Sequence, residues 1–329
     1  MMEETVKSAG EFGCIDRICH DLIYRPELVK LGAGDDCAVY RALPGMDQLI
    51  STDTLVEGIH FTGATMHAAD VGWKLCTANF SDIAAMGGDP VSFVISAALP
   101  DDLPLSWLTA CYDGIREACR AFRVNLLGGD ITGSRQGVVL TGTVVGMVPE
   151  NTAVRRSGAV PGDLLAVTGT VGDSAAGLAA LLQGLAADYP SLVEKHQRPV
   201  PQIGAGKILR EAGVHAIDDI TDGLASESHE IAGASGVDLL IHGDLVPLSA
   251  GVVQLGKKLG KDPLSYALRG GEDYQLLTAG PKEALAKAAE TIPLTVIGKV
   301  WEGSGAVYLE GKGKEKLLPR IGYDHFLNN

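Results

Sequence analysis

The sequence has few cysteines, and none of them forms a pattern that marks a disulfide framework or a metal site. Six occur among 329 residues, none lies beyond Cys119, and no two are spaced C-x-x-C. Zinc sites and disulfide-linked small domains use closely spaced, paired cysteines. We therefore interpret all six as buried or partly buried thiols in a reducing compartment, the cytoplasm: Cys14, Cys19, Cys37, Cys76, Cys111 and Cys119.

Basic residues and long apolar runs are also scarce. There are 27 Lys and Arg residues against 41 Asp and Glu residues, which gives a net charge of −14. Nucleic-acid binding draws on clustered basic residues, so a nucleic-acid partner is excluded. No stretch has 18 uninterrupted apolar residues, and the opening MMEETVKSAGEFG lacks the blocks of a signal peptide. We expect a soluble protein with no membrane partner.

The common nucleotide-binding and hydrolase motifs are absent as well. IGAGKIL contains Gly206 and Lys207, but a P-loop would need glycine in place of Pro201 and Ser or Thr in place of Ile208. No G-x-G-x-x-G follows a strand, the protein-kinase motifs are missing, and no G-x-S-x-G occurs. These absences exclude a P-loop enzyme, a Rossmann dinucleotide site, a protein kinase and an α/β-hydrolase.

What is present is an alternation of segments rich in β-branched residues with segments rich in Ala and Leu. Glycine-rich joints separate them, a pattern typical of α/β proteins. Pro, Asn and Gly accumulate in PENTAVRRSGAVPGD, residues 149–163, before a new apolar strand begins. We therefore predict two domains, residues 1–150 and 151–329, each containing strands and helices.

The predicted elements follow from hydrophobic periodicity and from the residues that stop it. In the first domain we predict strands at 48–54, 91–99, 124–130 and 137–148, and helices at 68–87 and 105–122. The first of these helices carries Val71, Leu75, Ala78, Phe80 and Ile83 on one side. In the second domain we predict strands at 164–170, 237–241, 274–279 and 294–297, and helices at 174–187, 203–211, 224–234 and 281–290.

Carboxylates stand beside Gly, Ser, Thr or Asn at strand ends and helix starts. One such stretch is ordinary turn or cap chemistry. The sequence has five: GAGDDCAV (32–39), STDT (51–54), NFSD (79–82), GGDIT (128–132) and DDITDG (218–223). Mg²⁺ prefers oxygen ligands and is held by a few carboxylates together with substrate phosphates. The five stretches therefore predict a protein that binds an anionic substrate through metal ions.

Two further features have both a structural and a functional interpretation. VTGTVGDSAAGL, residues 167–178, runs through glycines into a helix N-terminus, whose amides could hold a phosphate or simply form a turn. Apart from His60, the histidines show no mutual metal-ligand spacing, and we interpret them as structural: His20, His67, His196, His215, His229, His242 and His325.

Taken together, the motifs identify a family. Eleven short stretches carry this match, and they occur in the order typical of the family from one end of the chain to the other. They are GEFG, GDD, STDTLVEGIHF, NFSDIAAMGGDP, GGD, RSGAVPGD, VTGTVGDSAAGL, RPVP, TDGL, GGEDYQL and GYDHF. In these stretches the sequence resembles the thiamine-monophosphate kinases, which make thiamine diphosphate from ATP and thiamine monophosphate. The spread of matches makes the resemblance specific.

The resemblance implies a two-domain α/β (α+β) fold like that of aminoimidazole ribonucleotide synthetase. In that fold a mixed N-terminal sheet with helices pairs in a homodimer, and the C-terminal domain is α/β. It also implies ATP as co-substrate, several Mg²⁺ ions, and metal-assisted transfer without an acid or base catalyst. The implied metal ligands are Asp36, Ser51, Thr52, Asp53, Asp82, Asp130, Asp219 and Asp222; the implied ATP contacts are Tyr112, Gly129, Asp130, Arg156 and Thr221; the implied thiamine contacts are His60, Glu272 and Tyr323.

The thiamine contacts also have plainer interpretations. By itself His60 is typical of a half-buried surface histidine, and Tyr323 could either stack on a cationic thiazolium or dock the C-terminal tail. Glu272 and Asp273 could form a tight turn with solvated acids, or Glu272 could accept a hydrogen bond from an aminopyrimidine.

The sequence departs from the family pattern at three places. Thr221 replaces the usual Ser, Ile131 follows GGD, and Glu227 with Ser228 stands where Asp-Leu is frequent, so we assign no ligand beyond Asp222. Two alternatives stay open. One is another superfamily synthetase or kinase with a different acceptor, and the other is a non-catalytic Mg-nucleotide sensor.

Overall fold

The structure is a computed structural model that describes Thr5, Cys14, Arg17, Ile18 and residues 20–31, 39–40 and 42–323. The chain divides into two compact units. The first contains Met1–Ile83 and Asp89–Glu150, and the second contains Ala84–Gly88 and Asn151–Asn329. Among the described residues, no helix is both long enough and apolar enough to cross a membrane.

The first unit is built on a four-stranded sheet in the order β3-β6-β4-β5. β4 and β5 run parallel, whereas β6 is antiparallel to both β3 and β4, so the sheet is mixed as predicted. The elements are η1 (Pro26–Leu28), β1 (Val29–Leu31), β2 (Val39–Tyr40), β3 (Met46–Val56), α2 (Ala68–Ala85), β4 (Asp89–Pro100), α3 (Leu105–Phe122), β5 (Asn125–Ser134) and β6 (Val139–Pro149).

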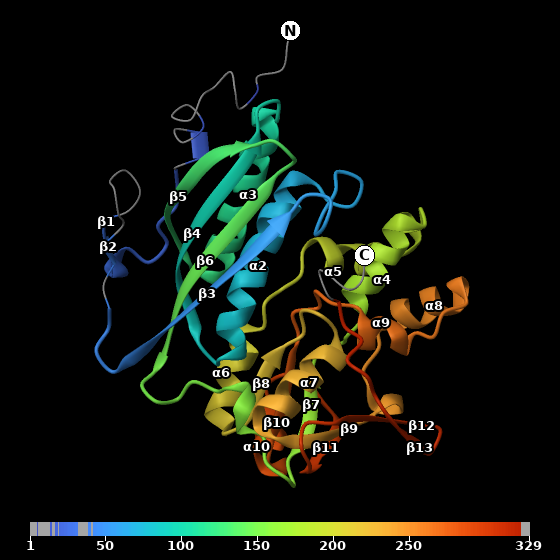
Figure 1. Cartoon of the computed structure of the whole chain (residues 1–329). Helices are drawn as coiled ribbons and strands as arrows, with labels where there is room; N and C mark the ends of the chain where they lie inside the picture. Colours follow the sequence, from blue (N-terminus) through green and yellow to red (C-terminus); the bar gives the residue numbers. More distant parts are fainter. Residues whose placement is uncertain are drawn as a thin grey trace. The chain divides into compact units, whose positions relative to one another are not determined.

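Helices α2 and α3 cover one face of this sheet (Figure 1). The apolar side predicted for α2 is confirmed, because Val71, Leu75 and Phe80 have no exposed surface. α2 approaches the sheet closely at Gly142 of β6, where a Cβ atom would lie 2.5 Å from Nδ2 of Asn79 on α2. Only glycine permits that approach, which brings the polar residues of α2 against strand β3.

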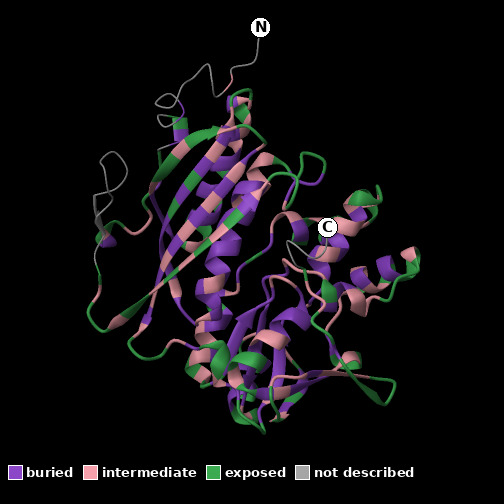
Figure 2. Cartoon of the chain, viewed as in Figure 1, coloured by how far each residue is buried: buried purple, intermediate pink, exposed green. Residues whose placement is uncertain are grey.

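The two faces of the sheet differ in burial because successive strand residues point to opposite sides. Along β3, Leu55 faces the helices and is buried, whereas Ile50 is 74 % exposed. Figure 2 shows the same alternation along the other strands. The face away from the helices, which we name the open face, carries Ile50, Thr52 and Thr54 from β3, Val94 and Ser96 from β4, and Thr141 and Thr143 from β6.

The second unit contains a seven-stranded sheet in the order β13-β12-β9-β11-β7-β10-β8, in which only β12 and β9 pair in parallel. Its strands are β7 (Leu164–Thr168), β8 (Ala216–Asp219), β9 (Val237–His242), β10 (Leu276–Gly280), β11 (Leu294–Glu302), β12 (Val307–Gly311) and β13 (Lys314–Leu317). Its helices are α4 (Asp173–Leu182), α5 (Pro190–Gln197), α6 (Ile203–Ala212), α7 (Leu224–Ser235), α8 (Ala250–Leu259), α9 (Leu264–Arg269) and α10 (Lys282–Ala289), with short turns η2 (Arg156–Gly158), η3 (Ala186–Asp188) and η4 (Gly243–Leu245).

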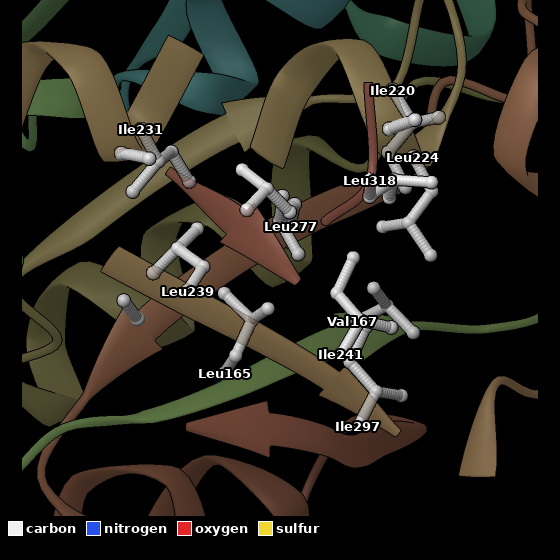
Figure 3. Close-up of a cluster of buried hydrophobic side chains, with 14 of the residues drawn as sticks. Leu165, Val167, Ile220, Leu224, Ile231, Leu239, Ile241, Leu277, Ile297 and Leu318 are labelled. Carbon is white, nitrogen blue, oxygen red and sulfur yellow. The ribbon is translucent and has the colours of Figure 1, made fainter. Parts of the chain in front are cut away.

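Helices pack on both faces of this sheet. Leu165 and Val167 of β7 lie in a core with α7, whereas Ala166 between them lies in a second core with α6 and α10. Figure 3 shows the first core, in which Ile220 and Leu224 lie at the two ends of the β8–α7 loop. α4, α5 and α8 form a third apolar cluster with Tyr266 of α9.

The predicted fold class is confirmed, with differences in detail. β1, β2, β8, β12, β13, α5, α8 and α9 were not predicted. Helix α4 ends at Leu182 rather than at residue 187, because Gly184 has a positive φ that does not continue a right-handed helix. Strand β10 begins at Leu276 rather than 274 because Tyr274 also has a positive φ, which no strand accommodates.

Candidate active site

In the first unit, two of the acidic stretches meet on the helix-covered face of the sheet. Ser51 and Asp53 alternate with Thr52 along β3, so they share the face that α2 covers. The Ser51 hydroxyl donates a hydrogen bond to Asp82 of α2. The Asp53 backbone N–H donates to Asn79 Oδ1 across 3.1 Å. STDT and NFSD therefore form one polar group of oxygen donors.

Two other predicted ligands lie on the opposite, open face. Thr52 Oγ1 donates to the Gly142 carbonyl across 2.6 Å. Asp130 is in register with Ser96, whose neighbours Ile95 and Ala97 are buried under the helices, so Asp130 shares the open face with Ser96. The structure therefore does not bring Thr52 and Asp130 into the Ser51–Asp53–Asp82 group. Asp36 lies outside the described residues.

In the second unit, the loop between β8 and α7 is held by a glutamate that the sequence left in doubt. Oε1 of Glu227 accepts hydrogen bonds from the Thr221 N–H at 3.2 Å, the Thr221 hydroxyl at 3.0 Å and the Asp222 N–H at 2.8 Å. Glu227 is buried in the first turn of α7. Its side chain fixes the loop that carries Thr221 and Asp222.

Arg156 is held by a residue that the sequence did not single out. Its Nε donates to Asp218 Oδ1 across 2.7 Å, and its guanidinium lies 3.9 Å from Glu230 Oε2. Burial raises the pKa of Asp218 to about 7, although Arg156 opposes the shift. The Arg156 side chain is 52 % exposed, so it is oriented by Asp218 while it remains accessible to a ligand.

Two motifs that lie far from the β8–α7 loop in the sequence, GGEDYQL and GYDHF, converge on it. The Glu272 N–H donates to the Thr221 carbonyl across 2.7 Å, and the Tyr323 N–H donates to the Asp222 carbonyl across 2.9 Å. At Gly271, a Cβ atom would lie 1.9 Å from the same Thr221 carbonyl oxygen, so this contact requires glycine. The structure therefore brings Thr221, Asp222, Glu272 and Tyr323 together.

In the glycine-rich turn before α4, the backbone N–H groups of Gly172 and Ser174 are not free to bind a phosphate, because Asp273 accepts both of them. Asp273 Oδ2 accepts from the Gly172 N–H at 2.5 Å, and Oδ1 accepts from the Ser174 N–H at 3.0 Å. The expectation that Asp273 is solvated is wrong, because its side chain is buried. Burial raises its pKa to about 7, against the effect of the two N–H donors.

The donors present fit a hard cation, although they are not assembled into one complete site. Every candidate ligand atom is an oxygen, the type that Mg²⁺ prefers. Asp218 Oδ2 and Glu227 Oε2 are buried and make no hydrogen bond within the described chain. Burial raises the pKa of Glu227 to about 8. A cation would compensate these buried oxygens. Among the described residues, however, no three acidic, histidine or cysteine side chains group closely enough for one ion.

The remaining predicted contacts occupy different environments. His60 lies in the turn after β3, where Nδ1 accepts from the Val56 N–H at 3.0 Å, so a neutral ring carries its proton on Nε2. Tyr112 of α3 is only 5 % exposed, which leaves little of its ring for a nucleotide. Gly129 lies in the exposed part of β5, and Tyr323 is 41 % exposed.

Sequence reasoning missed Asp218, Glu227, Asp273 and His196 as organising residues. Asp218 precedes the predicted ligand Asp219, and Asp273 follows the predicted thiamine contact Glu272. Their position next to a predicted site residue is the sequence feature that could have identified them. Glu227 was visible only as a departure from the family pattern. His196 gave no signal, because its partners are 22 and 76 residues away along the chain.

The comparisons with known proteins agree along the whole chain. The family model "AIR synthase related protein, N-terminal domain" matches residues 34–148, and "AIR synthase related protein, C-terminal domain" matches residues 160–310. The thiamine-monophosphate kinase of Bacillus subtilis (strain 168) is 35 % identical over 327 residues, covering 96 % of this chain and 99 % of the relative. The chain belongs to the thiamine-monophosphate kinase family.

Solved structures of thiamine-monophosphate kinases extend this likeness to both units. A crystal structure from Stenotrophomonas maltophilia K279a matches with a TM-score of 0.82 and 35 % identity, covering 93 % of this chain and 98 % of that chain. A structure described as "AaThiL complexed with AMPPCP and TMP" matches with a TM-score of 0.78 and 36 % identity, covering 99 % of each chain. The family assignment therefore rests on sequence and on fold.

Proposed function

We propose that this chain transfers the γ-phosphoryl group of ATP to the phosphate of thiamine monophosphate, producing thiamine diphosphate and ADP. The observation that carries the proposal is the convergence of Glu272 and Tyr323 on the Thr221–Asp222 loop. In the family resemblance Glu272 and Tyr323 contact the thiamine, Thr221 contacts the nucleotide and Asp222 is a metal ligand. The proposal also draws on the relative described with AMPPCP, an ATP analogue, and TMP.

The proposed acceptor explains why the site needs no general base. A phosphate monoester has a second pKa near 6, so at neutral pH its attacking oxygen is already ionised. The barrier is repulsion between two anions, which positioning and electrostatic stabilisation lower. We assign Arg156 to the nucleotide phosphates, because Asp218 orients its guanidinium while half of the Arg156 side chain remains exposed. Thr221 and Gly129 are proposed as further nucleotide contacts.

We further propose that the reaction depends on Mg²⁺. The ion would neutralise charge that develops on the transferred phosphoryl group. The proposed ligands are Ser51, Asp53 and Asp82 in the first unit and Asp219 and Asp222 in the second. In the first unit the rigid strand β3 and helix α2 hold the three donors, and in the second Glu227 fixes the loop of Asp222. Chelation with EDTA should abolish turnover, and added Mg²⁺ should restore it.

We also propose that the protein is a cytoplasmic homodimer. The open face exposes Ile50 at 74 % of its surface and also carries Val94 and several threonines. Exposed apolar side chains on a regular sheet face are suited to pairing with the same face of a second copy. Cys76, Cys111 and Cys119 are buried thiols, which suits a reducing compartment.

The function is tested by measuring ADP release with Mg·ATP and thiamine monophosphate, thiamine or no acceptor. Chromatography of the same samples quantifies thiamine diphosphate. The proposal predicts one diphosphate per ADP with the monophosphate alone. ATP binding without ADP release would support a nucleotide sensor, and ADP release that ignores all thiamine compounds would point to a different acceptor.

A further inference from the structure

The turn that carries Glu272 has an unusual backbone that its surroundings must hold in place. Glu272 has φ +65° and Tyr274 has φ +50°, two positive values on residues with side chains. Such conformations are disfavoured for these residues and persist only when the surroundings enforce them. The Glu272 and Tyr274 N–H groups donate to the Thr221 and Ile220 carbonyls at 2.7 and 2.9 Å. One side of the turn is therefore tied to the β8–α7 loop.

The other side of the turn is tied to the start of helix α4. Asp273, between the two strained residues, is buried and accepts the N–H groups of Gly172 and Ser174. Together these bonds hold the backbone from Glu272 to Tyr274. None of these bonds involves the Glu272 side chain.

His196 is the group in position to orient it. The ring, near the end of α5, is 2 % exposed. Its Nδ1 lies 3.7 Å from Glu272 Oε2 and forms a 3.1 Å hydrogen bond with the Ser174 hydroxyl. α5 is anchored on α4 by Leu192, which packs with Ala176 and Ala180. A rigid pair of helices thus brings a buried imidazole beside a partly exposed carboxylate.

We propose that His196 is a positioning residue for the acceptor substrate, holding the Glu272 carboxylate with the help of Ser174. This inference rests on the proposed function, in which Glu272 contacts thiamine. His196 is buried and acts through Glu272 rather than on the substrate. Its loss should therefore weaken thiamine monophosphate binding while leaving ATP binding unchanged.

Two substitutions of similar size separate this role from simple packing. His196→Asn keeps a polar atom at the position of Nδ1, whereas His196→Gln carries its amide at the position of Nε2 instead. We expect His196→Gln to raise KM for thiamine monophosphate about tenfold with little change in kcat or in KM for ATP. His196→Asn should remain within about threefold of the wild-type KM. Ser174→Ala should change KM in the same direction as His196→Gln.

The Glu272→Ala background tests whether His196 acts through Glu272. In that background His196→Gln should raise KM for thiamine monophosphate no further, because the carboxylate it orients is gone. The matched control is His215→Gln, which removes another histidine–carboxylate pair of the same unit, with Asp163 at 2.9 Å. His215→Gln should leave KM for thiamine monophosphate unchanged.

Binding calorimetry supplies a readout that needs no kinase activity. Thiamine monophosphate should bind to His196→Gln about tenfold more weakly than to His196→Asn. Hydrogen exchange in peptides covering residues 268–276 should be equal in the two variants, because the bonds of Glu272, Asp273 and Tyr274 hold that backbone. Equal affinity in the two variants, or an undiminished KM effect in the Glu272→Ala background, overturns the inference. If the wild type binds thiamine monophosphate but makes no thiamine diphosphate, the proposed function fails, and the affinity difference still tests the role of His196.

Discussion

Replacing Asp273 with Asn should change how stability depends on pH. Each tenfold change in proton affinity corresponds to about 1.4 kcal/mol. The rise of the Asp273 pKa from 3.8 to about 7 therefore corresponds to about 4 kcal/mol. The folded state binds this proton more tightly than the unfolded state. The stabilisation is complete below pH 3.8 and is lost as the pH rises through about 7.

About half of this change, ~2 kcal/mol, falls between pH 5 and pH 7. Across that window the wild type should lose ~2 kcal/mol of unfolding free energy relative to Asp273→Asn, with no further relative change above about pH 8. Asp273→Asn should also be less stable than the wild type at pH 5, because its amide nitrogen cannot accept from one of the two backbone N–H groups.

Urea unfolding followed by tryptophan fluorescence measures this difference. Trp301 is the sole tryptophan of the second unit, so Trp73→Phe and Trp107→Phe make the signal specific to that unit. The exposed Asp244, replaced by Asn, serves as the control. A wild-type stability that rises or stays level relative to Asp273→Asn between pH 5 and pH 7 would refute the reasoning. The Gly172 and Ser174 N–H groups would then be keeping Asp273 ionised.

Three more changes test other parts of the account. Asp53→Asn should lower kcat about 100-fold at saturating Mg²⁺ without changing the melting temperature, and a wild-type rate would remove Asp53 from the metal site. Gly271→Ala should cost about 2 kcal/mol in urea unfolding, because its Cβ would lie 1.9 Å from the Thr221 carbonyl oxygen. Ile50→Lys should convert a dimer to monomers in sedimentation equilibrium, and an unchanged mass would exclude the open face as the interface.

The fold was predictable where local pattern and burial agree. α3 has its predicted bounds, Leu105–Phe122, because its amphipathic pattern is clear and Pro104 precedes it. α5 was missed because PSLVEKHQ has few apolar residues, and its burial comes from packing on α4 rather than from its own pattern. β8 was missed because two aspartates end a strand of four residues.

The candidate site was predictable by residue type and only partly by arrangement. Motif recognition selected Thr221, Asp222, Glu272 and Tyr323, which the fold brings together. Alternation along the predicted strand already separates Thr52 from Ser51 and Asp53, but the sequence does not show which of the two faces the helix covers. Motif recognition also could not identify the residues that hold the loops, because Asp218, Asp273 and His196 act through contacts that only the folded chain creates.

The central claim is direct transfer of the γ-phosphoryl group of ATP to thiamine monophosphate. The most direct measurement supplies ATP labelled with ³²P at the γ-position, together with Mg²⁺ and thiamine monophosphate, and follows the label by chromatography. Direct transfer predicts that the label moves to thiamine diphosphate at the rate of ADP formation, with no labelled protein at any time. Label released as inorganic phosphate without labelled thiamine diphosphate, or retained covalently on the protein, would contradict it.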